Sequence, residues 1–597
     1  MQPVGLQEWI HKIEEGEGTK YIRLVFFILA ALALTVFWHV REAKNFTTIE
    51  AMDAAQVGRN LAEGKGFTTK FVRPFSIALI ESHRGSGPAP ALLKEAHPDI
   101  ANAPLYPALL AGLFKIMPVN WEVPGERFWR YQPEYFIGGL NQLLFFGALF
   151  LVFRLSTRLF DKAVGVLAVV LMMLTELYWQ FTTSGLSTLL LMVLFLWLVD
   201  VLVTFEAGAG AGEGKRSAAC VRGGAAYAGG YVWLMGLSRY SMLWLIIPVA
   251  VFLAATGAGS RGKLAATAIA ITALIMAPWL FRNYNLSGNP FGTAGFAIHH
   301  GTSPFPGHLL ERAMPENLEL QLNKIELGQY PRKLFVNARE IITKEIPLSA
   351  GNWIAALFVG AMLIPFRNPA LARLKYFTVG TVLLFIVVEA LGRTSLSAES
   401  ALINSENLIF VFTPLFFLFG CGLFYILLDQ VELPAPWLRA VIILGFVTVL
   451  SLPMMLRLLP PREMPVMYPP YWPPAIHEVS QWLEPEELMM SDLPWAVAWY
   501  GNRQSIWTTL DVGASERDDF YAINDERKAI KGLFLSPVTT NQRFLTEMWQ
   551  GREGVWAKFY LQVMVAKNLP SGFPLKMAPP GLLPDHLFLS DRIRWRQ

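Results

Sequence analysis

Long apolar runs recur along this chain, and they constrain its fold more than any other feature of the sequence. The runs lie at 22–40, 134–153, 163–181, 187–205, 224–238, 241–256, 264–280, 352–366, 375–392, 408–428 and 438–456. A helix that crosses a bilayer needs roughly 20 mainly apolar residues. Only 16% of the residues are charged, whereas soluble domains contain about 25%. We therefore predict an α-helical polytopic membrane protein with about eleven transmembrane helices.

Basic residues in the short loops predict the orientation of these helices. With a cytoplasmic N-terminus, the short outer loops contain only Arg239 and Arg393. The short inner loops then contain Arg154, Arg158, Lys162, Lys215, Arg216, Arg222, Arg261, Lys263, Arg367, Arg373, Lys375 and Arg439. This bias follows the positive-inside rule, and an odd number of spans puts the C-terminus outside. The first run is too long for a signal-peptide core and no A-x-A site follows it, so it predicts an uncleaved span. We expect a multi-pass protein of the plasma (inner) membrane.

The polar stretches divide the chain into three parts. Residues 1–21 predict a cytoplasmic amphipathic segment. Residues 22–456 predict a transmembrane domain with two long outer loops, 41–132 and 281–350. Residues 457–597 combine a stiff proline-rich linker with a small extracytoplasmic α/β domain. All large polar parts then share the outer face, where we expect the chemistry to take place.

Shorter elements are predicted within these outer parts. Residues 104–117 are apolar but too few for a span, which indicates an interfacial helix in the first outer loop. In the tail, we predict a helix at 477–483 and strands at 496–499, 505–509 and 532–535. The tail contains neither a Walker nor a Rossmann glycine motif.

The chain directly after the first span predicts a short helix that carries two acids. Thr47, three residues before Glu50, is typical of a capping box, and Gly64 is typical of a helix end. Glu50 and Asp53 lie one turn apart and share a face. The functional interpretation is a general base that takes the proton of an acceptor hydroxyl. The alternative is that both acids only stabilise the helix N-terminus, as a cap and through the dipole.

Other polar side chains lie close to predicted membrane ends. His97, Asp99 and Asn102 precede the interfacial helix, where they complete an acidic site or form a solvated loop with Asp99 as a cap. Arg282 follows Pro-Trp at the end of a span, and Arg239 lies in the turn LSRYS between two spans. A guanidinium group can bind a phosphate through two hydrogen bonds. The alternative for both arginines is an interfacial anchor whose head group reaches the water.

Several classes of function have no support in the sequence. A net charge of +4 does not favour nucleic acid. Cys220 and Cys421 fall in different environments, so neither a disulfide nor a thiol site is expected. His299 and His300 are adjacent and lack companions at ligand spacing, which makes them loop or acceptor-binding residues rather than metal ligands. A requirement for a divalent metal is left open. No G-x-S-x-G, H-E-x-x-H or CxxC motif is present.

Together, these segments resemble the GT-C superfamily of polyprenyl-phosphate-sugar-dependent glycosyltransferases. The likeness is to bacterial relatives of the protein O-mannosyltransferases and the aminoarabinose transferase (glycosyltransferase family 39 and its kin). The segments that carry it run in the order of the family and cover about residues 20–430. They are EAMDAAQVGRNLAEGKGF after the first span, PLYPALLAGLF, the LSRYS turn, APWLFRNYNLSGNP after a span, and the outer α/β tail.

The resemblance implies transfer of a sugar from a polyprenyl-phosphate carrier to a hydroxyl of a lipid, glycan or protein, with inversion, outside the cytoplasm. It implies that an acid in the first outer loop is the base or orients the acceptor, here Glu50 or Asp53, with Asp99 as a candidate second acid. Arg239, Arg282 and Arg393 are its candidates for the carrier phosphate, whose charge grows as it leaves.

Three positions depart from the pattern of the family. Glu50 stands where an aspartate is usual, which leaves open whether Glu50 or Asp53 acts. Ala101 and Asn102 stand where the family often has its second acid. Glu406-Asn407-Leu408 stands where many relatives have Arg-Tyr at the start of a late span.

We therefore predict a membrane glycosyltransferase of hexosyl or pentosyl groups. The alternative is a non-catalytic transport or assembly protein with an outer binding domain, or a transferase that has lost activity. Transporters usually contain repeats and broken helices near the middle of the membrane. No internal repeat is seen here, and the acids lie at the surface, which favours the enzyme.

Overall fold

The fold is described from a computed structural model. It describes residues 17–42, 45–85, 88–94, 96–125, 128–209, 218–256, 261–314, 318, 322–351, 353–394, 402–459, 472–510, 512, 519–540, 554–565, 567–570, 572–582 and 586–595. Outside these residues lie most of the predicted cytoplasmic segment and most of the proline-rich linker. Lys215 and Arg216 of the predicted inner loops also lie outside them.

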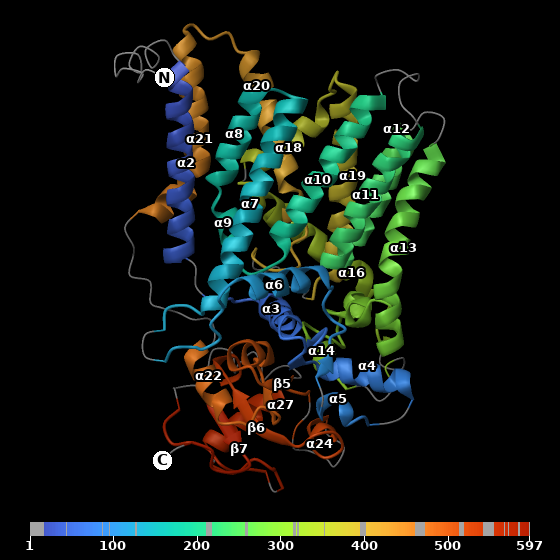
Figure 1. Ribbon diagram of the computed structural model, residues 1–597, viewed down its shortest axis with the longest axis vertical. Coiled ribbons are helices and arrows are strands. Elements are labelled where there is room, and N and C mark those ends of the chain that lie inside the picture. Colours follow the sequence, from blue (N-terminus) through green and yellow to red (C-terminus); the bar gives the residue numbers. More distant parts are fainter. Residues whose placement is uncertain are drawn as a thin grey trace, which may run out of the picture.

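A bundle of long helices forms one half of the molecule (Figure 1). Each of the predicted apolar runs contains or overlaps a helix or a pair of consecutive helices. These are α2 (Glu17–Val36) with η1 (Phe37–Glu42), α7 (Gln132–Leu159), α8 (Lys162–Met173) with α9 (Glu176–Thr183), α10 (Thr188–Ala209), α11 (Ala218–Ser238), η2 (Tyr240–Leu245) with α12 (Ile246–Thr256), α13 (Arg261–Ser287), α18 (Trp353–Leu363), α19 (Pro369–Gly392), η5 (Ile409–Phe412) with α20 (Thr413–Asp429), and α21 (Pro436–Leu458).

Fewer of these helices meet the requirements for a span than the predicted eleven. Within the described residues, seven helices are long and apolar enough, and two bent pairs raise the number to nine. One pair is α8 with α9, bent by 58°, and the other joins Gln329–Ser349 to Trp353–Leu363 at 110°. Tyr240–Thr256 is shorter than a full span. The predicted runs 224–238 and 241–256 are the ones that do not meet the criteria for a span. The chain is a multi-pass membrane protein.

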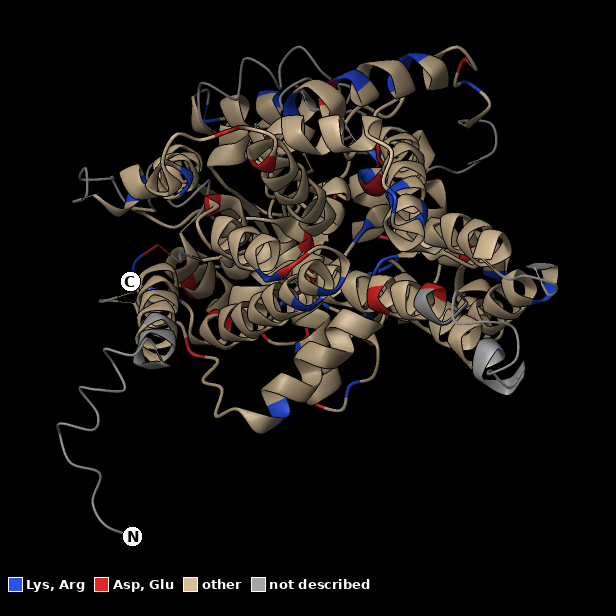
Figure 2. Ribbon diagram, turned by 90° about the horizontal axis from the view of Figure 1, so that it is seen from above, with Lys and Arg blue, Asp and Glu red and all other residues tan. Residues whose placement is uncertain are grey.

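Charged side chains occupy a small part of the bundle. Figure 2, which looks down on the molecule from above, shows that most of the ribbon carries no Lys, Arg, Asp or Glu. The helices at its edges expose many large apolar side chains, such as Phe26 on α2 and Leu274 on α13, which are 74% and 71% exposed. A bilayer rather than water suits such surfaces.

An outer layer of short helices covers the end of the bundle that lies opposite the start of α2 (Figure 1). Its main helices are α3 (Ile49–Ala62) and α6 (Leu105–Ile116), and α6 runs across the bundle rather than along it. The two helices approach closely at Gly58, where a Cβ atom would lie 3.0 Å from the Cβ of Leu110. The layer also contains α4 (Pro74–Arg84), α5 (Ala91–Lys94), η3 (Gly292–His299), α14 (Leu309–Arg312), α16 (Gln329–Glu340), η4 (Ile341–Glu345) and α17 (Ile346–Ser349).

The start of α3 differs from the prediction. Thr48, rather than Thr47, is the N-cap residue, and its side chain accepts no capping hydrogen bond. The predicted capping box is therefore absent, and the carboxylate of Glu50 accepts a hydrogen bond from Ser405 instead. The end is as predicted, because Gly64 follows the helix with a φ of 77° that glycine adopts without strain.

A five-stranded sheet forms the core of the outer α/β unit. Its strand order is β2 (Phe71–Val72), β5 (Gln504–Trp507), β4 (Leu488–Ser491), β6 (Ile530–Leu535) and β7 (Leu587–Ser590), and all adjacent pairs are parallel except β6–β7. Strand β2 comes from the first outer loop, so the expected boundary at residue 457 divides a single sheet. The helices of the unit are α22 (Pro473–Gln481), α23 (Pro494–Ala496), η6 (Val497–Gly501), α24 (Asp519–Asn524), α25 (Pro537–Thr540) and α27 (Gly554–Met564), and a separate pair joins β1 (Thr68–Thr69) to β3 (His97–Pro98).

Two of the three strands predicted in the tail are present as β5 and β6. The third prediction, 496–499, is wrong, because these residues are helical in α23 and η6. Their side chains are buried on every side, and a short apolar run that is wholly buried does not distinguish a strand from a helix. Pro494 at the first helical position favours the helix.

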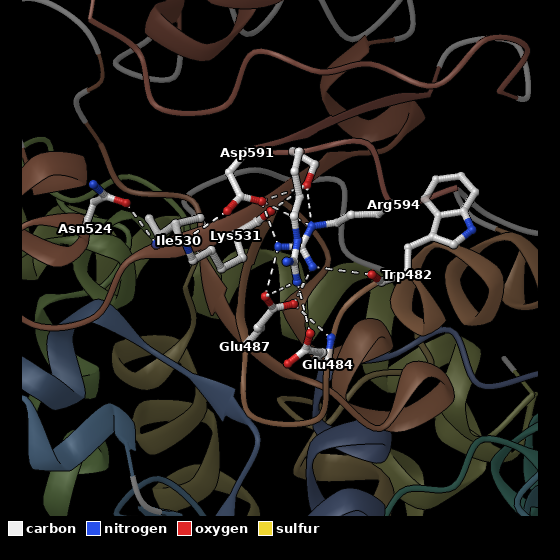
Figure 3. Close-up of polar contacts among 10 residues, drawn as sticks. Trp482, Glu484, Glu487, Asn524, Ile530, Lys531, Asp591 and Arg594 are labelled. Carbon is white, nitrogen blue, oxygen red and sulfur yellow. Dashed lines mark hydrogen bonds and ion pairs between the residues drawn. The ribbon is translucent and has the colours of Figure 1, made fainter. Parts of the chain in front are cut away.

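One polar cluster links segments within the outer unit, and a second joins the unit to the bundle. Arg594 donates to Glu487 over 2.9 Å and to Asp591 over 2.7 Å, which ties the end of the chain to the residue before β4 (Figure 3). At the bundle, buried Glu134 in the first turn of α7 accepts hydrogen bonds from Trp499 Nε1 and Tyr500 Oη, at 2.9 and 2.8 Å. The bundle and the outer unit therefore share a buried polar contact.

Candidate active site

A cavity of about 930 Å³ lies where the bundle meets the outer layer. Its walls come from α3, the segment 101–107, the turn 238–244, the loop 291–311, the end of α19 and the segment 405–408. Glu50 and Asp53, which the sequence places on one face of α3, both line it. So do four other candidates from the sequence: Asn102, Arg239, Arg393 and His300.

Asp53 is a deeply buried acid of this cavity. Its side chain is 1% exposed, and Oδ2 accepts hydrogen bonds from Arg73 Nη2 at 2.8 Å and Asn102 Nδ2 at 2.9 Å. Its second oxygen, Oδ1, has no hydrogen-bond partner among the residues that the structure describes. Burial raises the pKa of Asp53 to about 6, with Arg73 opposing the rise and Asp99 adding to it. Asp53 therefore presents one free carboxylate oxygen with the basicity expected of a general base near neutral pH.

Asp99 lies behind this acid and does not line the cavity. Its Oδ1 accepts from the backbone N–H of Ala101 at 2.9 Å, and its Oδ2 accepts from Asn102 Nδ2 at 2.9 Å. Since the same Asn102 nitrogen also donates to Asp53, Asp99 holds the amide that orients Asp53. Nearby His97 is buried, with Nε2 2.8 Å from Ser76 Oγ. The geometry gives Asp99 a supporting position rather than one in contact with a substrate.

Arg73 and Glu311 are site residues that sequence reasoning missed. Arg73 follows strand β2 directly, bonds Asp53 through Nη2 and contacts Glu311 Oε2 through Nε at 3.1 Å. Arg73 and Glu311 are 238 residues apart in the chain. The available signal was the segment Phe-Val-Arg-Pro, a short apolar pair followed by a charge, which is too short to predict a strand. The C-terminal sheet thus positions an arginine of the first outer loop.

Glu50 has different surroundings from Asp53. Ser405 Oγ donates to its Oε1 over 2.8 Å, across 355 residues of sequence. Glu406, the next residue, accepts a hydrogen bond from the backbone N–H of Thr394 at 3.1 Å and also lines the cavity. The segment that departs from the family pattern thus supplies a further acid to the wall.

The three arginine candidates occupy distinct environments. Arg239 lines the cavity, and its Nε donates to Ser241 Oγ at 3.2 Å. No carboxylate in the described part of the chain lies within ion-pair distance of Arg239. Arg393 is buried between Glu345 and Glu389, at 2.6 and 2.8 Å, so its charge is already compensated.

Arg282 does not line the cavity. It donates to the carbonyl oxygens of Asp99 and Phe67, at 2.9 and 3.2 Å, and its guanidinium lies 4.7 Å from the centre of the Trp279 ring. These contacts brace the loop around Asp99. The structure therefore brings only Arg239 to the cavity as an arginine without a carboxylate partner, among the residues that it describes.

The adjacent histidines are oriented differently. His299 Nδ1 lies 2.8 Å from Tyr330 Oη, and the residue does not line the cavity. His300 does line it and is buried. Within the described ranges, no group of three or more His, Cys, Asp or Glu side chains has the arrangement of a metal site.

Comparisons with known proteins identify the fold. No protein-family model matches the chain, and no curated protein matches it. The crystal structure of ArnT from Cupriavidus metallidurans bound to undecaprenyl phosphate aligns with a TM-score of 0.55 at 11% identity, over 95% of this chain and 98% of that one. ArnT in the apo state gives a TM-score of 0.49 at 11% identity, over 97% and 99%. The archaeal oligosaccharyltransferase AglB from Archaeoglobus fulgidus, in complex with an inhibitory peptide and a dolichol-phosphate, gives 0.49 at 10% identity, over 91% and 72%. The chain therefore has the GT-C fold that the sequence predicts.

Proposed function

We propose that this protein is a membrane glycosyltransferase that moves a hexosyl or pentosyl group from a polyprenyl phosphate to a hydroxyl of a lipid, glycan or protein. One observation carries the proposal. A single cavity contains a buried carboxylate with a free oxygen, Asp53, and an arginine without a carboxylate partner among the described residues, Arg239. The carboxylate of Asp53 is suited to act as a general base, and the guanidinium of Arg239 is suited to bind a phosphate. The same fold in ArnT, whose crystal structure contains undecaprenyl phosphate, supports this type of carrier.

The phosphate of the carrier is assigned to the turn at Arg239. Ser238, the preceding residue, has a buried Oγ atom without a hydrogen-bond partner in the described part of the chain. A guanidinium and a hydroxyl can both donate to phosphate oxygens. The adjoining cavity wall is apolar, with Leu243, Leu384 and Val387 among its residues, and this wall suits the first isoprene units.

The transfer step follows from these positions. The acceptor oxygen forms a bond to the anomeric carbon while the bond from that carbon to the phosphate oxygen breaks, which inverts the configuration. The acceptor proton passes to Asp53 Oδ1, and the bonding electrons leave with the phosphate. Arg239 stabilises the negative charge that grows on the leaving group. The surroundings favour Asp53 over Glu50 as the base, because Arg73 and Asn102 fix Asp53 and leave one oxygen free.

The test uses purified protein in lipid nanodiscs. Radiolabelled sugars on undecaprenyl phosphate are the donors, and a membrane extract supplies acceptors. We expect Asp53→Asn to lower transfer by at least about 10²-fold, the usual range for loss of general base catalysis. Glu50→Gln should retain more activity, and Glu63→Gln is the matched control, because Glu63 ends the same helix outside the cavity.

Two results would contradict the proposal. Full activity of Asp53→Asn would remove Asp53 from the chemistry. Failure of the folded wild type to consume any donor would favour a transport or assembly protein that has the GT-C fold without its chemistry.

A further inference from the structure

His300 has a buried ring nitrogen that forms no hydrogen bond with any residue that the structure describes. The side chain is 5% exposed and lines the cavity, and its Nδ1 atom has no hydrogen-bond partner. Burial of a ring nitrogen without a hydrogen-bond partner is unfavourable unless a ligand supplies that partner.

The backbone around His300 is built to hold the ring in place. Lys333 Nζ donates to the carbonyl oxygens of His300 and Ile298. Gly301 has a φ of 70°, and a Cβ atom there would lie 2.5 Å from the carbonyl oxygen of Thr394. The turn after His300 therefore packs directly against the end of α19. Such a rigid support indicates a side chain with a positional role.

Burial keeps the ring of His300 neutral. It lowers the pKa of the ring to about 4; Glu311 opposes this effect, and His308 and Lys333 add to it. At neutral pH, the ring is therefore uncharged and can accept a hydrogen bond but does not take up a proton.

We propose that His300 Nδ1 accepts a hydrogen bond from a hydroxyl group of the sugar that is transferred. This inference rests on the proposed function, which puts the sugar between the phosphate at Arg239 and the acceptor at Asp53. Most of the hydrogen-bond donors of a polyprenyl-phosphate sugar are the hydroxyl groups of the sugar. A site that bonds a hydroxyl also rejects analogues that lack it, so His300 is a specificity residue for the donor sugar.

The experiment compares binding of two probes in nanodiscs. One is undecaprenyl phosphate, and the other is undecaprenyl phosphate that carries glucose, mannose, galactose or aminoarabinose. The readout is the ratio of the two dissociation constants, which isolates the contribution of the sugar. We expect at least one sugar to bind more tightly than the bare carrier in the wild type. His300→Phe should reduce that gain by about fivefold and leave the bare carrier unaffected.

Two variants make the test specific. His300→Asn has an amide near the position of Nδ1, so it should retain more of the gain than His300→Phe. His299→Phe is the matched control, because His299 Nδ1 already pairs with Tyr330 Oη outside the cavity. A melting curve for each variant confirms that it is folded.

The outcomes separate this inference from the function on which it rests. An unchanged ratio in folded His300→Phe, or an equal loss in His299→Phe, overturns the role of His300 and leaves the function intact. The role of His300 is also overturned if the wild type binds undecaprenyl phosphate but binds none of the sugar-linked carriers more tightly. If the wild type binds neither probe, the proposed function fails, and this inference fails with it.

Discussion

The ion pair between Arg73 and Asp53 should set the pH at which the protein works. Asp53 acts as a base only when it is ionised, and its pKa is about 6. The transfer rate of the wild type should therefore be near its plateau at pH 7 and fall about tenfold for each pH unit below 6. Arg73 opposes the effect of burial, so its removal should raise the pKa of Asp53 further.

The size of this change follows from the geometry. Arg73 Nη2 lies 2.8 Å from Asp53 Oδ2, which corresponds to about 4 Å between the centres of charge. Two unit charges at that distance interact by about 4 kcal/mol at an effective dielectric constant of 20, a factor of about 10³ in the ionisation constant. In Arg73→Gln, the ionised fraction of Asp53 at pH 7 then falls from about 0.9 to about 0.01. We expect transfer to fall about 100-fold at pH 7 and to recover as the pH rises.

The assay is single-turnover transfer in nanodiscs between pH 5 and pH 9.5. Arg73→Lys keeps the charge and should keep the inflection near that of the wild type. Removal of Arg73 also leaves the half-buried Glu311 without its ion-pair partner, so Arg73→Gln/Glu311→Gln is a second variant that removes both charges. An equal loss of activity at every pH, with the inflection unmoved in either variant, would refute the reasoning.

Three further predictions concern single positions. Arg239→Met should weaken binding of undecaprenyl phosphate about 10- to 100-fold, measured by titration in nanodiscs, because a hydrogen bond to a charged group contributes about 1.5–3 kcal/mol. Glu134→Leu should leave the buried Trp499 N–H without its acceptor, cost about 1–3 kcal/mol and increase proteolysis of the C-terminal unit. Gly301→Ala should lower the melting temperature, because a Cβ atom would lie 2.5 Å from the carbonyl oxygen of Thr394 and because this positive φ costs a residue other than glycine about 1–3 kcal/mol.

Each of these predictions has a control and a result that would contradict it. Arg457→Met removes an arginine that is already paired with Glu42 and Glu176 and should leave carrier binding unchanged; equal loss in both arginine variants would indicate a general effect of charge. Glu134→Gln retains an acceptor oxygen, so proteolysis equal to that of the leucine variant would contradict the hydrogen-bond argument. Gly307→Ala, also at a positive φ but with no atom within 4 Å of the added Cβ, isolates the steric part of the Gly301 effect.

The sequence by itself determined the helical scaffold and the placement of two acids on one face of a helix. Every apolar run forms a helix, because burial in a bilayer requires backbone hydrogen bonds within the segment and so allows little other than a helix. The pairing of Glu50 with Asp53 was also predictable, since residues three apart share a helix face whatever surrounds them. The fold resemblance followed from the order of these local segments.

The tertiary structure decided which polar groups act together. Three arginines were equal candidates in the sequence, yet Arg393 meets Glu345 and Glu389, and Arg282 meets backbone carbonyl groups. Arg73 entered the site because β2 joins a sheet whose other strands come from the C-terminal tail. Such contacts join residues up to hundreds of positions apart, and no periodic pattern encodes them. Local patterns thus fix where elements form, whereas the charge state and hydrogen bonding of a site depend on neighbours that only the packed chain supplies.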